Sequence, residues 1–231
     1  MNGKSWAVFI VIVVAVIGGM IYTSTQGKLD ISDVSSDASN KIMKAEDRNG
    51  QIGDHVFGNP DSKILLIEYG DFQCNPGCRL FHENFEPIMR SAEYKEKIAF
   101  VYRHFPITQS HPHAIAAASA AEAAGLQDKF WDMWNVLFAN QAEWSQSSAA
   151  SRGELFEGYA ERIGLDIDKF RQDAGSDAVS KKINFDRALA SAAKVTGTPT
   201  VFLNGKLVDG SELASTETMK TMIDRAIEET K

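Results

Sequence analysis

Residues 68–78 read EYGDFQCNPGC and contain the only two cysteines of this 231-residue chain, Cys74 and Cys78. A β-branched apolar run at residues 64–67 precedes them and predicts a buried strand. Apolar side chains after them recur with helical spacing, at Phe81, Phe85 and Ile88. The two cysteines therefore lie where a strand gives way to a helix.

A thiol at a helix N-terminus is close to unpaired N–H groups and to the positive end of the helix dipole, and both favour the thiolate. The thiolate is the form that exchanges disulfides and binds soft metals. A purely structural disulfide is the weaker interpretation, because a bridge across so few residues closes a very small loop and stabilises little. The motif therefore predicts a reactive pair.

Composition and charge argue against several other classes of protein. The chain is 44% hydrophobic and 24% charged, which is typical of a globular protein, and its net charge is −7. An acidic body argues against nucleic acid as a partner. With two cysteines in all, the chain has neither a disulfide framework nor a zinc-ribbon site.

The N-terminal region predicts a membrane anchor. An uncharged apolar run extends from Trp6 to Tyr22 and follows Lys4, so we expect residues 1–26 to be a signal anchor with the N-terminus in the cytoplasm. A cleaved signal peptide is the alternative, but the run exceeds a usual h-region of ~7–15 residues. Residues 27–50 are polar and predict a flexible stalk, and residues 51–231 are the expected folded domain.

Strand and helix patterns alternate in this domain, with a helical insert at about 108–193. We expect strands at 64–69, 98–105, 200–203 and 206–209, the last two joined by a type I′ turn at Asn204-Gly205. The predicted helices cover residues 78–89, 112–124, 128–140, 152–163, 166–172, 177–193 and a C-terminal segment from Ser215. This order predicts an α/β fold that a run of helices interrupts.

Several separated stretches together resemble the DsbA-like thiol-disulfide oxidoreductases, and more narrowly their membrane-anchored bacterial branch. They are residues 67–74 (IEYGDFQC), 78–82 (CRLFH), 103–106 (RHFP), 111–114 (HPHA), 121–125 (AEAAG), 129–131 (KFW) and 197–205 (GTPTVFLNG). The resemblance covers residues 51–231 and implies a thioredoxin fold with an inserted helical subdomain. It also implies that the chain needs no cofactor beyond a redox-active Cys74–Cys78 disulfide.

The resemblance assigns roles to three further residues. It implies that Pro199 is cis and faces the cysteine pair, which would free the backbone of Thr198 to bind an extended substrate. It places Glu68 as a buried acid beneath the disulfide, where it would relay protons. Burial would raise the pKa of this carboxyl group and suit it to that task.

The chain departs from the family in having three residues, rather than two, between its cysteines. We expect Asn75 to cap the helix, Pro76 to be its first residue and Cys78 its third, with Cys74 one residue out in the loop. Asn75 would then take N–H groups that otherwise stabilise the Cys74 thiolate. That arrangement predicts a weaker depression of the Cys74 pKa than in the two-residue relatives.

Other polar and aromatic side chains fit structural roles better than chemical ones. These are His82, His111 and His113, the aromatic group Phe130, Trp131, Trp134 and Phe138, and the pair Asp166 and Asp168. The aromatic group has helical spacing and is more typical of a core than of a peptide groove, and the aspartate pair suits helix capping.

The resemblance implies an extracytoplasmic enzyme that forms disulfides in reduced exported proteins. A membrane quinone reductase of the DsbB or VKOR type would reoxidise it. A different class of protein, the Sco-type copper chaperones, also carries two cysteines four apart on a thioredoxin fold, with a distant histidine, and thiolates favour Cu(I). An anchored binding module with incidental cysteines is a third possibility.

Overall fold

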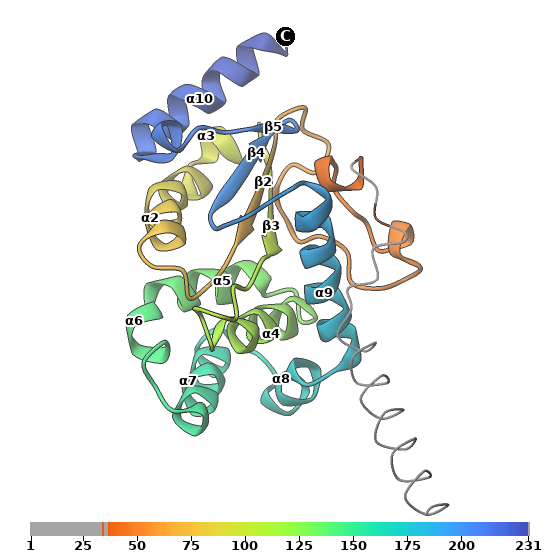
Figure 1. The fold of residues 1–231 in the computed structure, drawn as a ribbon, viewed down its shortest axis with the longest axis vertical. Helices are drawn as coiled ribbons and strands as arrows, with labels where there is room; N and C mark the ends of the chain where they lie inside the picture. Colours follow the sequence, from red (N-terminus) through yellow and green to blue (C-terminus); the bar gives the residue numbers. More distant parts are fainter. Residues whose placement is uncertain (1–33, 35–36, 231) are drawn as a thin grey trace, which may run out of the picture.

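A mixed five-stranded sheet forms the centre of the described part of the chain. The computed structural model describes residue 34 and residues 37–230. The strands are β1 (Val56–Gly58), β2 (Leu65–Gly70), β3 (Ala99–His104), β4 (Thr200–Leu203) and β5 (Lys206–Leu207). Their order across the sheet is β1-β3-β2-β4-β5, and β2 and β3 are parallel whereas the other neighbours are antiparallel (Figure 1).

Alternation along β2 sends side chains to two separate cores, because successive residues of a strand point to opposite faces. Leu66 packs with the core that includes helix α2 (Gly77–Arg90), whereas Ile67 and Tyr69 pack with a second core that includes α9 (Asp177–Ala192). Figure 1 shows α2 and α9 on opposite sides of the sheet. Helix α10 (Thr216–Glu229) packs beside α2.

The insert between β3 and β4 consists of six helices. They are α4 (Ala114–Gly125), α5 (Phe130–Ala139), α6 (Gln141–Trp144), α7 (Ala149–Arg162), α8 (Ile167–Ala174) and α9. Helix α4 is rich in buried alanine, so its small side chains let α5, α8 and α9 approach it closely. The predicted thioredoxin fold with a helical insert is confirmed.

The predicted elements differ from the structure mainly in short segments. The sequence does not predict strand β1, the short helices α3 (Ala92–Lys95) and α6, or the 3₁₀ turn η3 (Gly210–Leu213), because elements of three or four residues carry little periodicity. Pro87 lies in the last turn of α2, which continues to Arg90. The predicted hairpin is present, and both Asn204 and Gly205 have positive φ as a type I′ turn requires.

Residues 37–50 differ from the predicted flexible stalk. They contain two 3₁₀ turns, η1 (Ala38–Asn40) and η2 (Glu46–Arg48), and lie on the α9 face of the sheet. The buried guanidinium of Arg103 donates to the carbonyl oxygens of Ser39 (2.8 Å) and Lys41 (2.6 Å). Hydrogen bonds from Arg103 to the backbone thus hold this segment together with the buried side chains of Ala38 and Met43, and composition does not reveal such long-range contacts.

The predicted anchor from Trp6 to Tyr22 lies outside the described residues. None of the helices in the described part of the chain combines the length and apolar character that a bilayer crossing requires.

Candidate redox site at the start of helix α2

The two cysteines lie in the loop after β2 and the first turn of α2. The backbone N–H of Cys74 donates to the carbonyl of Asp71 (3.0 Å), and the N–H of Cys78 donates to Sγ of Cys74 (3.3 Å). Both are free thiols; Cys74 is 7% exposed and Cys78 is 0% exposed. A thiol-reactive partner therefore reaches Cys74 first.

The predicted capping arrangement was wrong. Helix α2 begins at Gly77 and not at Pro76, so Cys78 is its second residue rather than its third. Pro76 occupies the N-cap position after a cis Asn75-Pro76 bond, and no side chain caps the helix there. The inserted residue is absorbed in the loop, and Asn75 is exposed. Sγ of Cys74 instead accepts a helix N–H itself, as a capping oxygen would.

The surroundings lower the pKa of the Cys74 thiol and raise the pKa of the Cys78 thiol. The hydrogen bond from the Cys78 side chain is the largest cause that lowers the pKa of Cys74, which falls to about 6 although partial burial opposes the shift. Burial raises the pKa of Cys78 well above its ordinary value, and its bond to Cys74 acts in the same direction. Near neutral pH, Cys74 is thus the thiolate and Cys78 the thiol.

The segment before β4, which contains Thr198 and Pro199, packs against Cys74. The Thr198-Pro199 bond is cis, as the resemblance implies, and Sγ of Cys74 lies 3.4 Å from the carbonyl oxygen of Thr198. A Cβ added at Gly77 would lie 2.9 Å from Cδ of Pro199 and 3.3 Å from Sγ of Cys74. Only glycine lets the first turn of α2 approach Pro199 this closely.

Glu68 lies beneath the pair on the α2 face of the sheet. Its side chain is 0% exposed, and neither carboxyl oxygen has a hydrogen-bond partner. Burial raises the pKa of Glu68 well above that of an ordinary carboxyl group, and the nearby Cys74 adds to the shift. When ionised, Glu68 contributes to the raised pKa of Cys78, and its own raised pKa favours the protonated acid beside the buried thiol.

Two side chains that the sequence did not single out hold this loop. Gln141, on α6 of the insert, donates from Nε2 to the carbonyl oxygens of Phe72 (2.7 Å) and Cys74 (3.1 Å). The buried carboxylate of Asp71 accepts the N–H of Ile107 (2.8 Å) and contacts Nδ1 of His111 (2.7 Å). Sequence spacing could not show that α6 returns to the cysteine loop.

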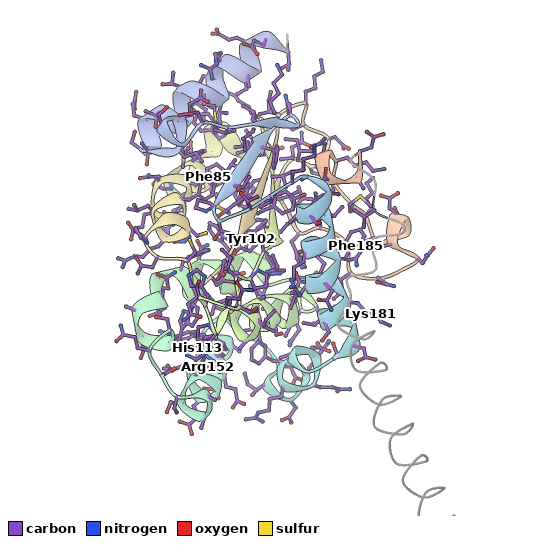
Figure 2. All side chains as sticks on the ribbon, viewed as in Figure 1. Phe85, Tyr102, His113, Arg152, Lys181 and Phe185 are labelled. Atoms are coloured by element: carbon purple, nitrogen blue, oxygen red, sulfur yellow. The ribbon has the colours of Figure 1, made fainter. Side chains whose placement is uncertain are left out.

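The remaining sequence candidates have structural partners. His82 bonds Asn135 through Nε2 (3.1 Å) and lies against the rings of Trp134 and Phe138. His113 accepts a bond from Arg152 (2.8 Å), and Figure 2 shows these two side chains together in the insert.

The aromatic group belongs to the core, and the aspartate pair belongs to helix α8. Phe130, Trp134 and Phe138 are buried, and Trp131 packs against the same core. Asp166 caps α8 by accepting the N–H of Lys169, and Asp168 pairs with Arg171 on the surface.

A buried ionic cluster lies deeper in the molecule. Its members are Asp54, His55, Arg103, His104, Glu122, Lys182 and Asp186. Candidate metal-ligand atoms of His104, Glu122 and Asp186 lie within 4.8 Å of one another. However, the Lys182 ammonium is 2.6 Å from Asp186, and each Glu122 oxygen is paired with a histidine. The Asp186 and Glu122 oxygens therefore already have partners within the protein, so the cluster fits a structural role.

The family comparison agrees with this fold and site. Residues 50–225 match the family Thioredoxin_4, described as thioredoxin. The chain therefore belongs to the thioredoxin family. Within that family its fold is that of the DsbA-type proteins, which confirms the fold that the resemblance implies.

Three solved structures illustrate the similarity. Oxidised BdbD from Bacillus subtilis has a TM-score of 0.65 at 21% identity, covering 81% of this chain and 97% of that one. The thiol-disulfide oxidoreductase MdbA from Actinomyces oris has a TM-score of 0.63 at 18% identity, covering 76% and 90%. A thioredoxin-like oxidoreductase from Silicibacter pomeroyi has a TM-score of 0.60 at 25% identity, covering 76% and 92%.

Sequence relatives include proteins named Na(+)/H(+) antiporter NhaA 1. The one from Mycolicibacterium gilvum is 39% identical over 157 residues, and the one from Salinispora arenicola is 40% identical over 159 residues. These matches cover 66% and 68% of this chain but only 24% and 22% of the relatives. The chain thus spans about a quarter of the length of these proteins.

Proposed function

We propose that this protein is a thiol-disulfide oxidoreductase that forms disulfides in other proteins through Cys74 and Cys78. The observation that carries the proposal is the asymmetry of the pair, because Cys74 is the more exposed thiol and has a pKa lowered to about 6, whereas Cys78 is fully buried with a raised pKa. A stabilised thiolate is a good leaving group, and it makes the corresponding disulfide an oxidant.

Oxidation of a substrate would proceed in two exchanges. A substrate thiolate attacks Sγ of Cys74 in the Cys74–Cys78 disulfide, and the departing Cys78 sulfur takes a proton from the buried Glu68. A second substrate thiolate then attacks the substrate sulfur of the mixed disulfide and releases Cys74 as its thiolate. The substrate has lost two electrons to the cysteine pair, and Glu68 must regain its proton.

Geometry supports a role for the Thr198-Pro199 segment in holding the substrate. It lies directly against Cys74, so an extended chain linked to Sγ would run alongside it. Backbone pairing with such a chain would orient the second substrate thiol whatever its neighbouring side chains are.

We further propose that the catalytic domain lies outside the cytoplasmic membrane, tethered by the apolar run from Trp6 to Tyr22. Its substrates would be reduced exported proteins, and a membrane protein of the DsbB or VKOR type would reoxidise it. The support is the apolar sequence itself, the oxidising character of that compartment and the similarity to the DsbA-type fold.

The competing copper-chaperone hypothesis needs a third ligand beside the two sulfurs. Among the described residues, the clustered metal-ligand candidates do not include either cysteine, and His111 and His113 contact Asp71 and Arg152. No specific observation favours copper over exchange.

The test uses the purified full-length chain in detergent. We expect it to oxidise a reduced, unfolded two-cysteine peptide stoichiometrically, and we expect Cys74→Ser to abolish the reaction. Cys78→Ser should instead trap mixed disulfides through Cys74. Tight stoichiometric Cu(I) binding without any exchange would contradict the proposal and favour the copper protein.

A further inference from the structure

Unpartnered buried polar atoms gather at one place beneath the cysteines. Among the described residues, seven buried side-chain nitrogen or oxygen atoms have no hydrogen-bond partner. Three of the seven are the two carboxyl oxygens of Glu68 and the hydroxyl oxygen of Tyr102. Buried polar groups in folded proteins are almost always paired, often through an ordered water, so this concentration calls for an explanation.

Glu68 and Tyr102 are direct neighbours across the parallel strands β2 and β3. They are register partners, so their side chains leave the sheet on the same face. A Cβ added at Gly70, two residues beyond Glu68, would lie 2.4 Å from Cε2 of Tyr102 and 2.9 Å from Oε1 of Glu68. The absent side chain of Gly70 thus leaves the space that the ring and the carboxyl group share.

The other surroundings offer Glu68 little polar support. Its neighbour on the opposite strand, β4, is the apolar Val201. The ring of Tyr102 is enclosed by aromatic side chains, among them Phe72 and Trp134, and Figure 2 shows Tyr102 near the middle of the molecule. The Tyr102 hydroxyl is therefore an unpartnered polar group that extends from the neighbouring strand on the same face of the sheet as the Glu68 carboxyl group.

Four other titratable groups face this pair. Cys74, Cys78 and Asp71 come from the active-site loop and α2, and each acts on Tyr102 electrostatically. The ring of His104 lies edge-on to that of Tyr102 at 5.5 Å and bonds Glu122 through Nε2. A Tyr102→Phe substitution leaves these four groups in the protein, so its effect reports the contribution of the Tyr102 hydroxyl.

We propose that Tyr102 is a positioning residue for the proton of Glu68, linked to the carboxyl group through one shared buried water. The inference rests on the proposed exchange function and deepens it. A water is needed because the two groups make no direct bond although both lack partners. Tyr102 donates to the water, and the water donates to Glu68 when the carboxyl group is charged.

The chemistry follows from which form of Glu68 the link favours. In the step where Cys78 attacks Sγ of Cys74, the Cys78 thiol passes its proton to the Glu68 carboxylate, a Cys74–Cys78 bond forms and the bound partner leaves as a thiolate. A donor chain ending at Glu68 stabilises the carboxylate that accepts this proton. Without the hydroxyl, fewer molecules hold Glu68 ready as a base at a given pH.

The test isolates that single step. A nitrothiobenzoate group is placed on the more exposed Cys74, and its coloured release reports the attack of Cys78 as a function of pH. We expect Tyr102→Phe to move the pH profile upward by about one unit, so that release on its rising limb is about tenfold slower. Tyr94→Phe, which removes a hydroxyl bound to Asp224 on α10, is the matched control and should leave the profile unchanged.

Glu68→Gln separates positioning from simple packing. If Tyr102 acts through Glu68, Tyr102→Phe causes no further shift in the Glu68→Gln background. An unmoved profile, or an equal effect in both backgrounds, would overturn the proposal. Should Tyr102→Phe fail to fold, a high-resolution crystal structure of the unaltered protein decides: a water within hydrogen-bond distance of both groups supports the pair, and its absence refutes it.

Failure of the proposed function is recognised separately. Infrared titration of the Glu68 carboxyl band, assigned through Glu68→Gln, needs no substrate. A higher midpoint in Tyr102→Phe supports the link even in a protein that exchanges no disulfides, whereas an equal midpoint refutes it.

Discussion

Cys78→Ala tests how the acidity of Cys74 is set. The hydrogen bond from the Cys78 side chain is the largest cause of the lowered Cys74 pKa, and a backbone N–H of the same residue also reaches the sulfur. Alanine removes the first donor and keeps the second. A hydrogen bond to a charged group contributes about 1.5–3 kcal/mol, and one pKa unit corresponds to about 1.36 kcal/mol.

The Cys74 pKa should therefore rise from about 6 by roughly one to two units in Cys78→Ala. Cys78→Ser is the matched variant, because its hydroxyl keeps a donor at the same position, and its Cys74 pKa should stay near the original value. Both values come from the ultraviolet absorbance of the thiolate across pH, with Cys74→Ala as the blank. The thiolate share near neutral pH should fall from about nine-tenths to one-half or less.

An unchanged Cys74 pKa in Cys78→Ala would refute this reasoning. It would show that the backbone N–H and the helix terminus carry the whole effect. An equal rise in the serine and alanine variants would also contradict it, because only alanine lacks the donor.

Three further predictions concern stability and support of the site. Gln141→Leu removes the two hydrogen bonds that the insert makes to the active-site loop. It should lower the free energy of unfolding by about 1–3 kcal/mol and speed alkylation of the buried Cys78 thiol. An unchanged alkylation rate would show that these hydrogen bonds are dispensable. Asp54→Asn breaks buried pairs with Arg103 and Lys182 and should cost about 3–5 kcal/mol in chemical denaturation. Because those cations hold the pKa of Asp54 at about 2 against its burial, stability should fall as pH drops from the ordinary carboxyl value toward 2, and Asp54→Asn should flatten that slope. Glu68 has a raised pKa, so the folded state keeps a proton that the unfolded state loses. The free energy of unfolding should therefore decline as the pH rises above the ordinary pKa of a carboxyl group. The same decline in a Glu68→Gln variant would contradict this.

Much of the fold follows from periodicity and turn chemistry. The apolar run at residues 64–67 and the helical spacing after Cys78 predict β2 and α2, and Asn204-Gly205 predicts the β4–β5 hairpin. These signals are local, because each depends on residues within one or two turns. The burial of Glu68 and the cis bond before Pro199 came from the resemblance rather than from the local pattern.

The details of the site depend on contacts that are distant in sequence. The prediction that Asn75 caps α2 applied a helix rule to an isolated segment, whereas the structure places Pro76 at the N-cap and packs the following Gly77 against Thr198-Pro199. Gln141 donates hydrogen bonds to Phe72 and Cys74, which lie 69 and 67 positions before it in the sequence. The β3 pattern could have placed Tyr102 on the same face as Phe100, but its pairing with Glu68 requires the register of two parallel strands.

The buried ionic cluster has a consequence for how the insert is joined to the rest of the chain. Its charges come from the segment before β1, from β3, and from helices α4 and α9, and most of its pairs join two of these parts. Excising the insert would leave Asp54 with Arg103 but without Lys182, and His104 without Glu122. The insert is therefore not a detachable module: sheet, insert and N-terminal arm should lose amide-exchange protection in one cooperative event.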